Sequence, residues 1–134
     1  TLNFTVTRTG FSAAAVGFTF ATANDSATAG SDYVAASGSG SIPGGGASGT
    51  TTLSVTINGD AVFENNETLF VNLTAPSNAT IADGQGIGTI TNDDTAPTLS
   101  INDVSIFEGN TGTTNLVFTV TRTGLTELPA TFTA

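Results

Sequence analysis

The side chains that could do chemistry in this sequence are carboxylates. The 134 residues include 11 Asp and Glu, only 2 Lys and Arg, and no Cys or His, for a formal net charge of −9. Without Cys or His, zinc fingers, thiolate clusters, cysteine nucleophiles and Ser-His-Asp triads are excluded. The chemistry left is that of hard oxygen ligands, which suit Ca²⁺.

Most of these acids stand in short polar segments that separate apolar stretches. Paired carboxylates also serve glycosidases, but no aromatic platform or pocket-forming insertion accompanies them here, and we predict that the chain is not an enzyme. The acids of interest are Asp25, Asp60, Glu64, Glu67, Asp93 and Asp94.

The composition also argues against nucleic-acid binding and against a membrane-spanning helix. Arg8 and Arg122 are the only basic side chains, too few to neutralise a phosphate backbone, so we expect no nucleic-acid partner. The apolar runs are a few residues long, whereas a membrane helix needs about 20, so we expect no membrane span. A hydrophobic content of 38% with nine Phe is enough for a folded core.

The elements that must position the acids have the period of β-strands. Leu2, Phe4 and Val6 alternate with polar residues, and similar alternation recurs near residues 16–20, 53–57, 69–73, 87–91 and 99–106. Gly, Asn, Asp and Pro separate these stretches, and no helical period is present. The pattern predicts an all-β fold, an antiparallel β-sandwich with about seven strands per repeat.

A repeat runs through the chain. Residues 2–10, LNFTVTRTG, recur 114 residues later as LVFTVTRTG at residues 116–124, with eight of nine positions identical. A period of this length indicates tandem domains. We expect residues 1–94 to be one repeat without its first strand, and residues 95–134 to be the opening strands of the next. We interpret the Gly-rich segment 43–49 as a hairpin loop rather than a domain linker.

The predicted topology gathers the acids. In an antiparallel sandwich, the ends of the strands near residues 20, 57 and 91 and the start of the strand near residue 69 lie at one pole. All six acids named above would then meet there, although they span about seventy residues. Crowded carboxylates repel each other, and Ca²⁺, which accepts six to eight oxygens, would resolve the conflict. Carbonyl oxygens of Asn24 and Asn92 could complete the shell.

Three blocks together resemble the Calx-beta domain. They are ATAGSDY at residues 27–33, NGDAVFENNE at 58–67 and GTITNDD at 88–94, and the segment IFEG at 106–109 matches the opening of the family. The resemblance implies an immunoglobulin-like sandwich in which some members bind calcium through the first loop, the C–D turn, the E–F loop and the closing acids. Carried over, it assigns Glu108 to the first loop of the second repeat, and Asp60, Glu64, Glu67, Asp93 and Asp94 to the last two positions. Gly59, Asn92 and Asn24 depart from the family's acids, which implies fewer ions or weaker binding.

Two other features have simpler interpretations. Arg8 and Arg122 share one repeat position at the opposite pole, where we expect a hydrogen bond that stabilises a turn. Asp32 and Tyr33 resemble a sugar-binding pair, but we expect Tyr33 to pack and to bond its hydroxyl to backbone.

The leading functional hypothesis is a structural, Ca²⁺-stabilised repeat of an extracellular, bacterial stalk, adhesin or fibre, with neighbouring repeats or copies of itself as head-to-tail partners. One alternative is a filament subunit in which residues 98–106 complete a neighbouring copy by strand addition. Another is a calcium-sensing regulatory module.

Overall fold

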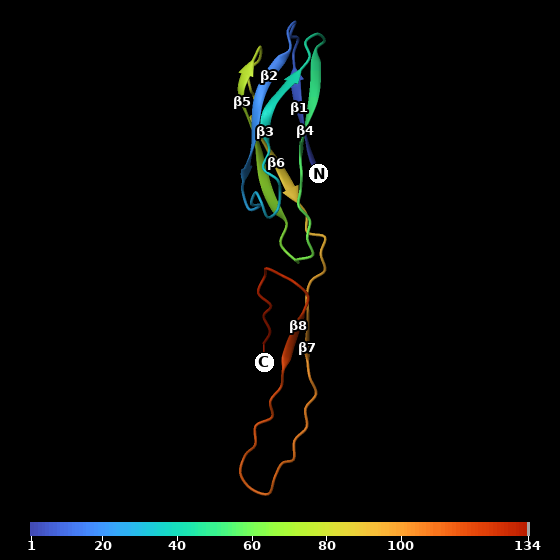
Figure 1. The fold of residues 1–134 in the computed structure, drawn as a ribbon, viewed down its shortest axis with the longest axis vertical. Coiled ribbons are helices and arrows are strands. Elements are labelled where there is room, and N and C mark those ends of the chain that lie inside the picture. The colour runs from blue at the N-terminus through green and yellow to red at the C-terminus, as the bar shows by residue number, and fades with distance from the viewer. Residues whose placement is uncertain (134) are drawn as a thin grey trace. The chain divides into compact units, whose positions relative to one another are not determined.

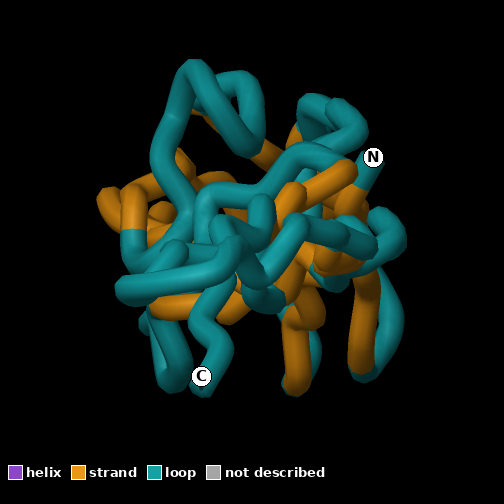
Figure 2. Tube along the Cα trace, turned by 90° about the horizontal axis from the view of Figure 1, so that it is seen from below, coloured by secondary structure: helices purple, strands orange, loops and turns teal. Residues whose placement is uncertain are grey.

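The computed structural model describes residues 1–133 and contains strands and loops without a helix in that range, as Figure 2 shows. No helix in this part of the chain is long and apolar enough to cross a membrane. The chain forms two compact units. The first unit comprises Thr1–Asp60 and Asn65–Thr91, and the second comprises Ala61–Glu64 and the chain from Asn92 onward.

The first unit is a sandwich of two antiparallel sheets, which confirms the predicted fold class (Figure 1). One sheet pairs β1 (Leu2–Thr9) with β4 (Ser48–Val55). The other has the order β3-β2-β5-β6. Its strands are β2 (Val16–Asn24), β3 (Ser37–Ile42), β5 (Glu67–Ser77) and β6 (Gln85–Ile90).

Alternation along each strand explains the two layers. In β1 the residues Leu2, Phe4 and Val6 are half-buried, and the polar residues Asn3 and Thr5 between them are exposed, because successive side chains of a strand point to opposite faces. The inward-facing residues of both sheets form one core. Its buried members are Phe18, Ala27, Tyr33, Ile42, Leu53, Val55, Leu69 and Val71.

The packing of Phe18 depends on glycine at the position opposite it in the neighbouring strand β3. A Cβ atom on Gly40 would lie 2.3 Å from Cζ of Phe18, and Phe18 is itself buried in the core. The aromatic ring therefore occupies the space that any other residue at position 40 would fill.

The segment 43–49 corrects one prediction. It joins Ile42 at the end of β3 to β4, and these strands lie in different sheets. The loop is therefore a crossover between the layers, and the hairpin interpretation is wrong. Both flanking strands belong to the first unit, so the segment is not a domain linker either.

The second unit contains one strand pair. Strand β7 (Thr98–Ile101) pairs antiparallel with β8 (Val120–Thr123). Their register places Leu99 opposite Arg122 and Ile101 opposite Val120. The pairing continues past the strands, where the backbone N–H of Asn102 donates to the carbonyl of Thr119 at 3.3 Å.

Candidate metal centre

Two carboxylates of the first unit lie close together at one pole of the sandwich. Asp32 is in the loop between β2 and β3, and Glu67 is the first residue of β5. Each offers one carboxylate oxygen, and the two oxygens lie within 4.8 Å of each other. Both side chains are half-buried, so water screens their repulsion less than at an open surface. Such a pair suits a hard divalent cation.

A buried tyrosine anchors the loop that carries Asp32. Tyr33 is 1% exposed, and its hydroxyl donates to Oδ1 of Asn24 at 2.7 Å. The same oxygen accepts the backbone N–H of Ala29 at 2.9 Å. Tyr33 therefore packs as predicted, but its hydroxyl bonds to a side chain rather than to backbone. These two donors occupy the side-chain oxygen of Asn24, so only its backbone carbonyl is left for the predicted role in a metal shell.

Hydrogen bonds fix Asp32 itself. Its Oδ2 accepts the backbone N–H of Thr28 at 2.6 Å, and its own N–H donates to the Thr28 carbonyl at 3.0 Å. The carbonyl of Asp32 accepts the N–H of Asn58 at 3.0 Å. The Asn58 side chain in turn donates to the carbonyls of Gly30 and Ser31. The loop is thus held to the chain that follows β4 before any ion binds.

Two of the predicted ligands belong to the first unit but lie outside this close pair. Asp25 is exposed, and its Oδ2 accepts the hydroxyl of Thr68 at 2.6 Å. This bond ties Asp25 to the residue next to Glu67. Asp60 is exposed at the end of the segment that follows β4.

The other predicted ligands belong to the second unit. The backbone N–H of Glu64 donates to Oδ1 of Asn92 at 3.0 Å, and Nδ2 of Asn92 donates to the carbonyl of Asp94 at 3.2 Å. Asn92 thus holds two loop segments of that unit together. Asp93 is exposed beside Asp94, and Glu108 is exposed between β7 and β8.

The acid that the sequence analysis missed is Asp32. Asp32 stands in the block ATAGSDY, one of the three blocks that resemble the Calx-beta domain. The resemblance also implies ligands from the C–D turn, and this implication was the signal in the sequence that could have identified Asp32. In the sequence Asp32 resembles one half of a sugar-binding pair with Tyr33, whereas in the structure the burial of Tyr33 positions Asp32.

At the opposite pole of the first unit, the Arg8 side chain links two turns by hydrogen bonds. Its guanidinium donates to the carbonyls of Gly10, Gly45 and Ser48, the last two at 2.8 and 3.1 Å. The side chain is 6% exposed. The expected role of Arg8 in stabilising a turn is confirmed, and the turns concerned are those that follow β1 and precede β4.

The chain is similar to a known domain family and to solved structures. The sequence model of the Calx-beta domain family matches residues 1–96. A crystal structure of the apo-form Calx CBD1 domain is 26% identical, with a TM-score of 0.60, and the match covers 69% of this chain and 84% of that one. No curated protein sequence matches the chain.

Two longer structures are also similar. The calcium binding domain CBD12 of CALX1.1 is 25% identical with a TM-score of 0.62, and the match covers 81% of this chain and 47% of that one. CBD12 from CALX1.2 is 25% identical with a TM-score of 0.61, over 76% of this chain and 43% of that one. This chain therefore spans less than half the length of either CBD12 structure. With the family match over residues 1–96, these likenesses establish that the chain belongs to the Calx-beta domain family.

Proposed function

We propose that this chain is a calcium-stabilised β-sandwich repeat with a structural rather than a catalytic role. The observation that carries the proposal is the pair Asp32 and Glu67, whose carboxylate oxygens lie within 4.8 Å of each other, Asp32 on a hydrogen-bonded loop and Glu67 at the start of β5. Similar solved structures are described as calcium binding domains. Carboxylate oxygens are the ligands that Ca²⁺ takes in proteins, so the donor set fits the ion.

The proposed ion is bound first by Asp32 and Glu67. Glu64 stands three residues before Glu67 in the chain, and we assign its carboxylate as the third ligand of the ion. Of the remaining predicted acids, Glu108 is assigned to the corresponding site of the following repeat. The others complete the shell, directly or through water. They are Asp25, Asp60, Asp93 and Asp94.

Calcium would stabilise the fold for two reasons. It removes the repulsion between carboxylates that the fold holds close together. It also binds the folded chain in preference to the unfolded chain, in which residues 32 and 67 are not held near each other. At a free calcium concentration of 100 times Kd, this linkage contributes about 2.7 kcal/mol. A domain of this size would then melt several degrees higher.

Calorimetry in calcium and in chelator tests this function. We expect the melting temperature of the chain to rise with Ca²⁺, and most of the rise to disappear in the double variant Asp32→Asn, Glu67→Gln. Asp103→Asn is the matched control, because Asp103 is an exposed acid in the segment that follows β7. An equal calcium response in all three proteins would show that the ion does not bind at Asp32 and Glu67.

The biological setting we propose is a tandem array on the outside of a bacterial cell, as part of a stalk, adhesin or fibre. Support comes from the repeated motif at residues 2–10 and 116–124, which indicates successive domains. Asp93 and Asp94 stand where one repeat passes to the next in the sequence, so calcium there would stiffen the array. Small-angle scattering of a chain of several repeats, with calcium and with chelator, tests this role. A calcium sensor would instead transmit its change to an effector domain in the same polypeptide.

A second function is assembly by strand addition, in which residues 98–106 complete a neighbouring copy. The observation that favours it is an apolar groove of about 560 Å³ along β1 in the first unit. Sedimentation velocity over a hundredfold range of concentration tests it, since assembly by strand addition produces larger species as concentration rises. A monomer over the whole range would contradict this function.

A further inference from the structure

The segment that follows β4 contains a reactive pair of residues, Asn58 and Gly59. Of all the asparagines in the sequence, only Asn58 precedes a glycine. The backbone nitrogen of a residue after asparagine can attack the asparagine side-chain amide, and glycine favours this attack because it has no Cβ to hinder the approach. Both residues are exposed. Asn58 is therefore the asparagine whose sequence most favours this reaction.

The structure leaves the backbone of Gly59 open. A Cβ atom on Gly59 would meet no atom outside residues 58–60 within 4 Å, so nothing packs on this side of the residue. In the part of the chain that the structure describes, the Gly59 N–H donates to no other residue. The attacking nitrogen is therefore not held by a competing hydrogen bond within the chain.

The other half of the pair holds the loop that carries Asp32. Nδ2 of Asn58 donates to the carbonyl of Gly30 at 3.0 Å and to the carbonyl of Ser31 at 2.9 Å. The backbone N–H of Asn58 donates to the carbonyl of Asp32 at 3.0 Å. One residue thus binds three consecutive carbonyls of residues 28–33, which we call the Asp32 loop. We call these three hydrogen bonds the Asn58 clamp.

Deamidation of Asn58 is a complete reaction with water as the only co-reactant. The Gly59 N–H loses its proton to a solvent base, and the nitrogen forms a bond to Cγ of Asn58. The Cγ–Nδ2 bond breaks, and the leaving nitrogen takes up a proton and departs as ammonia. Water then opens the resulting succinimide ring at either carbonyl and yields aspartate or isoaspartate. The net change is hydrolysis of one amide, without oxidation or reduction.

The product cannot make the contacts of the amide. An ionised carboxylate accepts hydrogen bonds but donates none. Its oxygens would face the carbonyl oxygens of Gly30 and Ser31, where the amide places hydrogens. Isoaspartate also lengthens the main chain by one carbon between residues 58 and 59. Either product therefore breaks the two side-chain bonds of the Asn58 clamp.

We propose that Asn58 is a site of spontaneous deamidation and that this modification releases the Asp32 loop. The clamp itself restrains the reaction, because the side chain must leave Gly30 and Ser31 before it can turn toward Gly59. The rate of modification therefore follows the local opening of the loop.

Calcium links this site to the candidate metal centre, a step that rests on the proposed function. An ion bound by Asp32 would hold the Asp32 loop closed and slow the deamidation of Asn58. Modified chains would bind calcium less tightly, since Asp32 would no longer be held in place. Modification would then accumulate in chains that have been without calcium.

Peptide mass spectrometry measures the modification directly. Cleavage after Leu53 and Phe63 yields the peptide 54–63, in which Asn58 has the only amide side chain. After long incubation at mildly alkaline pH, we expect aspartate and isoaspartate at position 58. The folded chain should react about tenfold more slowly than the chain unfolded in urea, because two hydrogen bonds must open first.

Gly59→Ala is the matched control for this measurement. The added Cβ meets no neighbouring atom in the fold, so the Asn58 clamp is kept, but the methyl group hinders ring closure. We expect the variant to suppress the reaction in the folded and in the unfolded chain. Equal rates in the folded and unfolded original chain would overturn the restraint by the clamp. A folded chain without product, long after the unfolded chain has reacted fully, would overturn the site.

Hydrogen exchange tests whether the modification releases the loop. In Asn58→Asp, which has the side chain of one product, we expect the amide hydrogen of Asp32 to exchange about tenfold faster. Asn58→Ala removes the same side-chain bonds without adding a charge and should act in the same direction. Asn110→Asp is the charge control, because Asn110 is exposed in the second unit.

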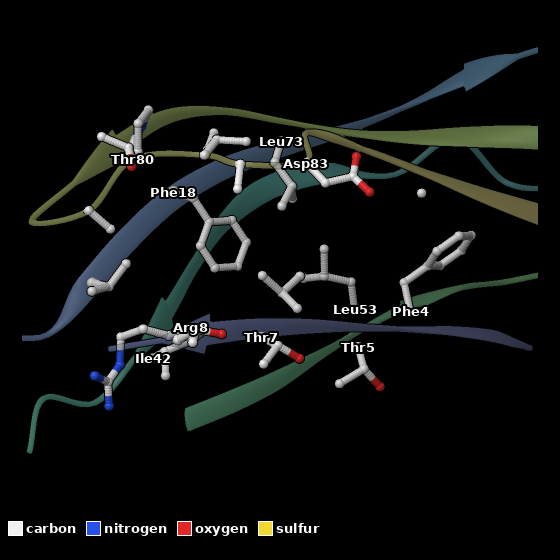
Figure 3. Close-up of a pocket in the computed structure, with 18 of the residues that line it drawn as sticks. Phe4, Thr5, Thr7, Arg8, Phe18, Ile42, Leu53, Leu73, Thr80 and Asp83 are labelled. Carbon is white, nitrogen blue, oxygen red and sulfur yellow. The ribbon is translucent and has the colours of Figure 1, made fainter. Parts of the chain in front are cut away.

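The reference amide for this experiment lies at the opposite pole, where Figure 3 shows the Arg8 side chain at one end of the cavity that residues of both sheets line. There the N–H of Gly10 donates to the carbonyl of Ala47 at 2.8 Å. We expect its exchange to be unchanged. Equal acceleration at Asp32 and Gly10 would indicate a general loss of stability and would overturn the local release of the loop.

Incubation in calcium and in chelator separates the inference from the function beneath it. Slower deamidation of Asn58 in calcium supports the link between the two sites. Equal rates in a chain whose melting temperature rises with calcium would overturn that link. Equal rates in a chain whose melting temperature ignores calcium would contradict the proposed function, while product at position 58 and faster exchange at Asp32 would still support the modification site.

Discussion

The hydroxyl of Tyr33 donates to Oδ1 of Asn24 across 2.7 Å, and this bond joins the end of β2 to the loop that carries Asp32. Tyr33 is 1% exposed, so the donor side of the bond is shielded from water. The position of the Asp32 carboxylate therefore depends on an uncharged pair formed by a core residue and the end of β2. This relationship explains how a polar loop keeps one geometry beside a repelling carboxylate.

Tyr33→Phe should destabilise the fold by about 1 kcal/mol, because it removes this hydrogen bond and keeps the aromatic packing. Urea denaturation measures the change in the free energy of unfolding. A double-mutant cycle with Asn24→Ala is the control, since the bond between Asn24 and Tyr33 must appear as a coupling energy. Additive effects of the two substitutions would show that the pair contributes nothing jointly.

Glu67→Gln should have effects of opposite sign in chelator and in calcium. Without calcium, neutralising one carboxylate relieves its repulsion with Asp32, and we expect a stability gain of about 0.5 kcal/mol. With saturating calcium, the variant loses an ionic ligand and should be less stable than the unchanged chain. Thermal melts in both conditions check the reversal of sign, and Glu127→Gln serves as a control with no reversal. A destabilised variant in chelator would contradict the repulsion between residues 32 and 67.

Arg8→Met should destabilise the first unit by about 2 kcal/mol. The guanidinium donates to carbonyls of two loops from a buried position, and bonds from a charged donor contribute more than neutral ones. Arg122→Met is a matched control, because Arg122 occupies the same repeat position and is exposed. We expect it to change stability by less than about 0.5 kcal/mol. Chemical denaturation of both variants measures the difference, and equal losses would count against the role of the buried contacts.

Gly40→Ala should cost about 1–3 kcal/mol through overpacking. The added Cβ would meet the ring of the buried Phe18, which would have to shift from its place in the core. Gly59→Ala is the control, since a Cβ there would have no atom within 4 Å. The midpoint of urea unfolding gives both values. A neutral Gly40→Ala would mean that the ring of Phe18 moves without cost.

The sequence allowed the fold to be predicted because alternation and turn residues are local signals. The alternation of Leu2, Phe4 and Val6 identified β1, and the buried or half-buried side chains match it. The segment 43–49 was misinterpreted because a Gly-rich loop has the same local pattern whether it joins paired strands or two sheets. Only the partners of β3 and β4 distinguish the two cases.

The candidate site was less predictable than the fold, because it depends on which loop folds over which strand. Asp32 has the appearance of a turn residue in the sequence, and its place beside Glu67 follows from the burial of the neighbouring Tyr33. The carbonyl of Asn24 looked available for a metal but accepts two hydrogen bonds within its own loop. Such competition between donors for one oxygen cannot be read from residue types.

The two ends of the sandwich are stabilised by different interactions, and at one end these are the hydrogen bonds of the buried Arg8 guanidinium. Arginine keeps its charge at any pH at which a protein folds, so the end closed by Arg8 stays closed whether or not calcium is present. At the end that carries Asp32 and Glu67, the proposed calcium ion would add to the hydrogen bonds of the loop, and this ion can leave. A fall in calcium would therefore loosen the first unit from one end only, and amide hydrogens near residues 28–33 would exchange before those near residues 8–10.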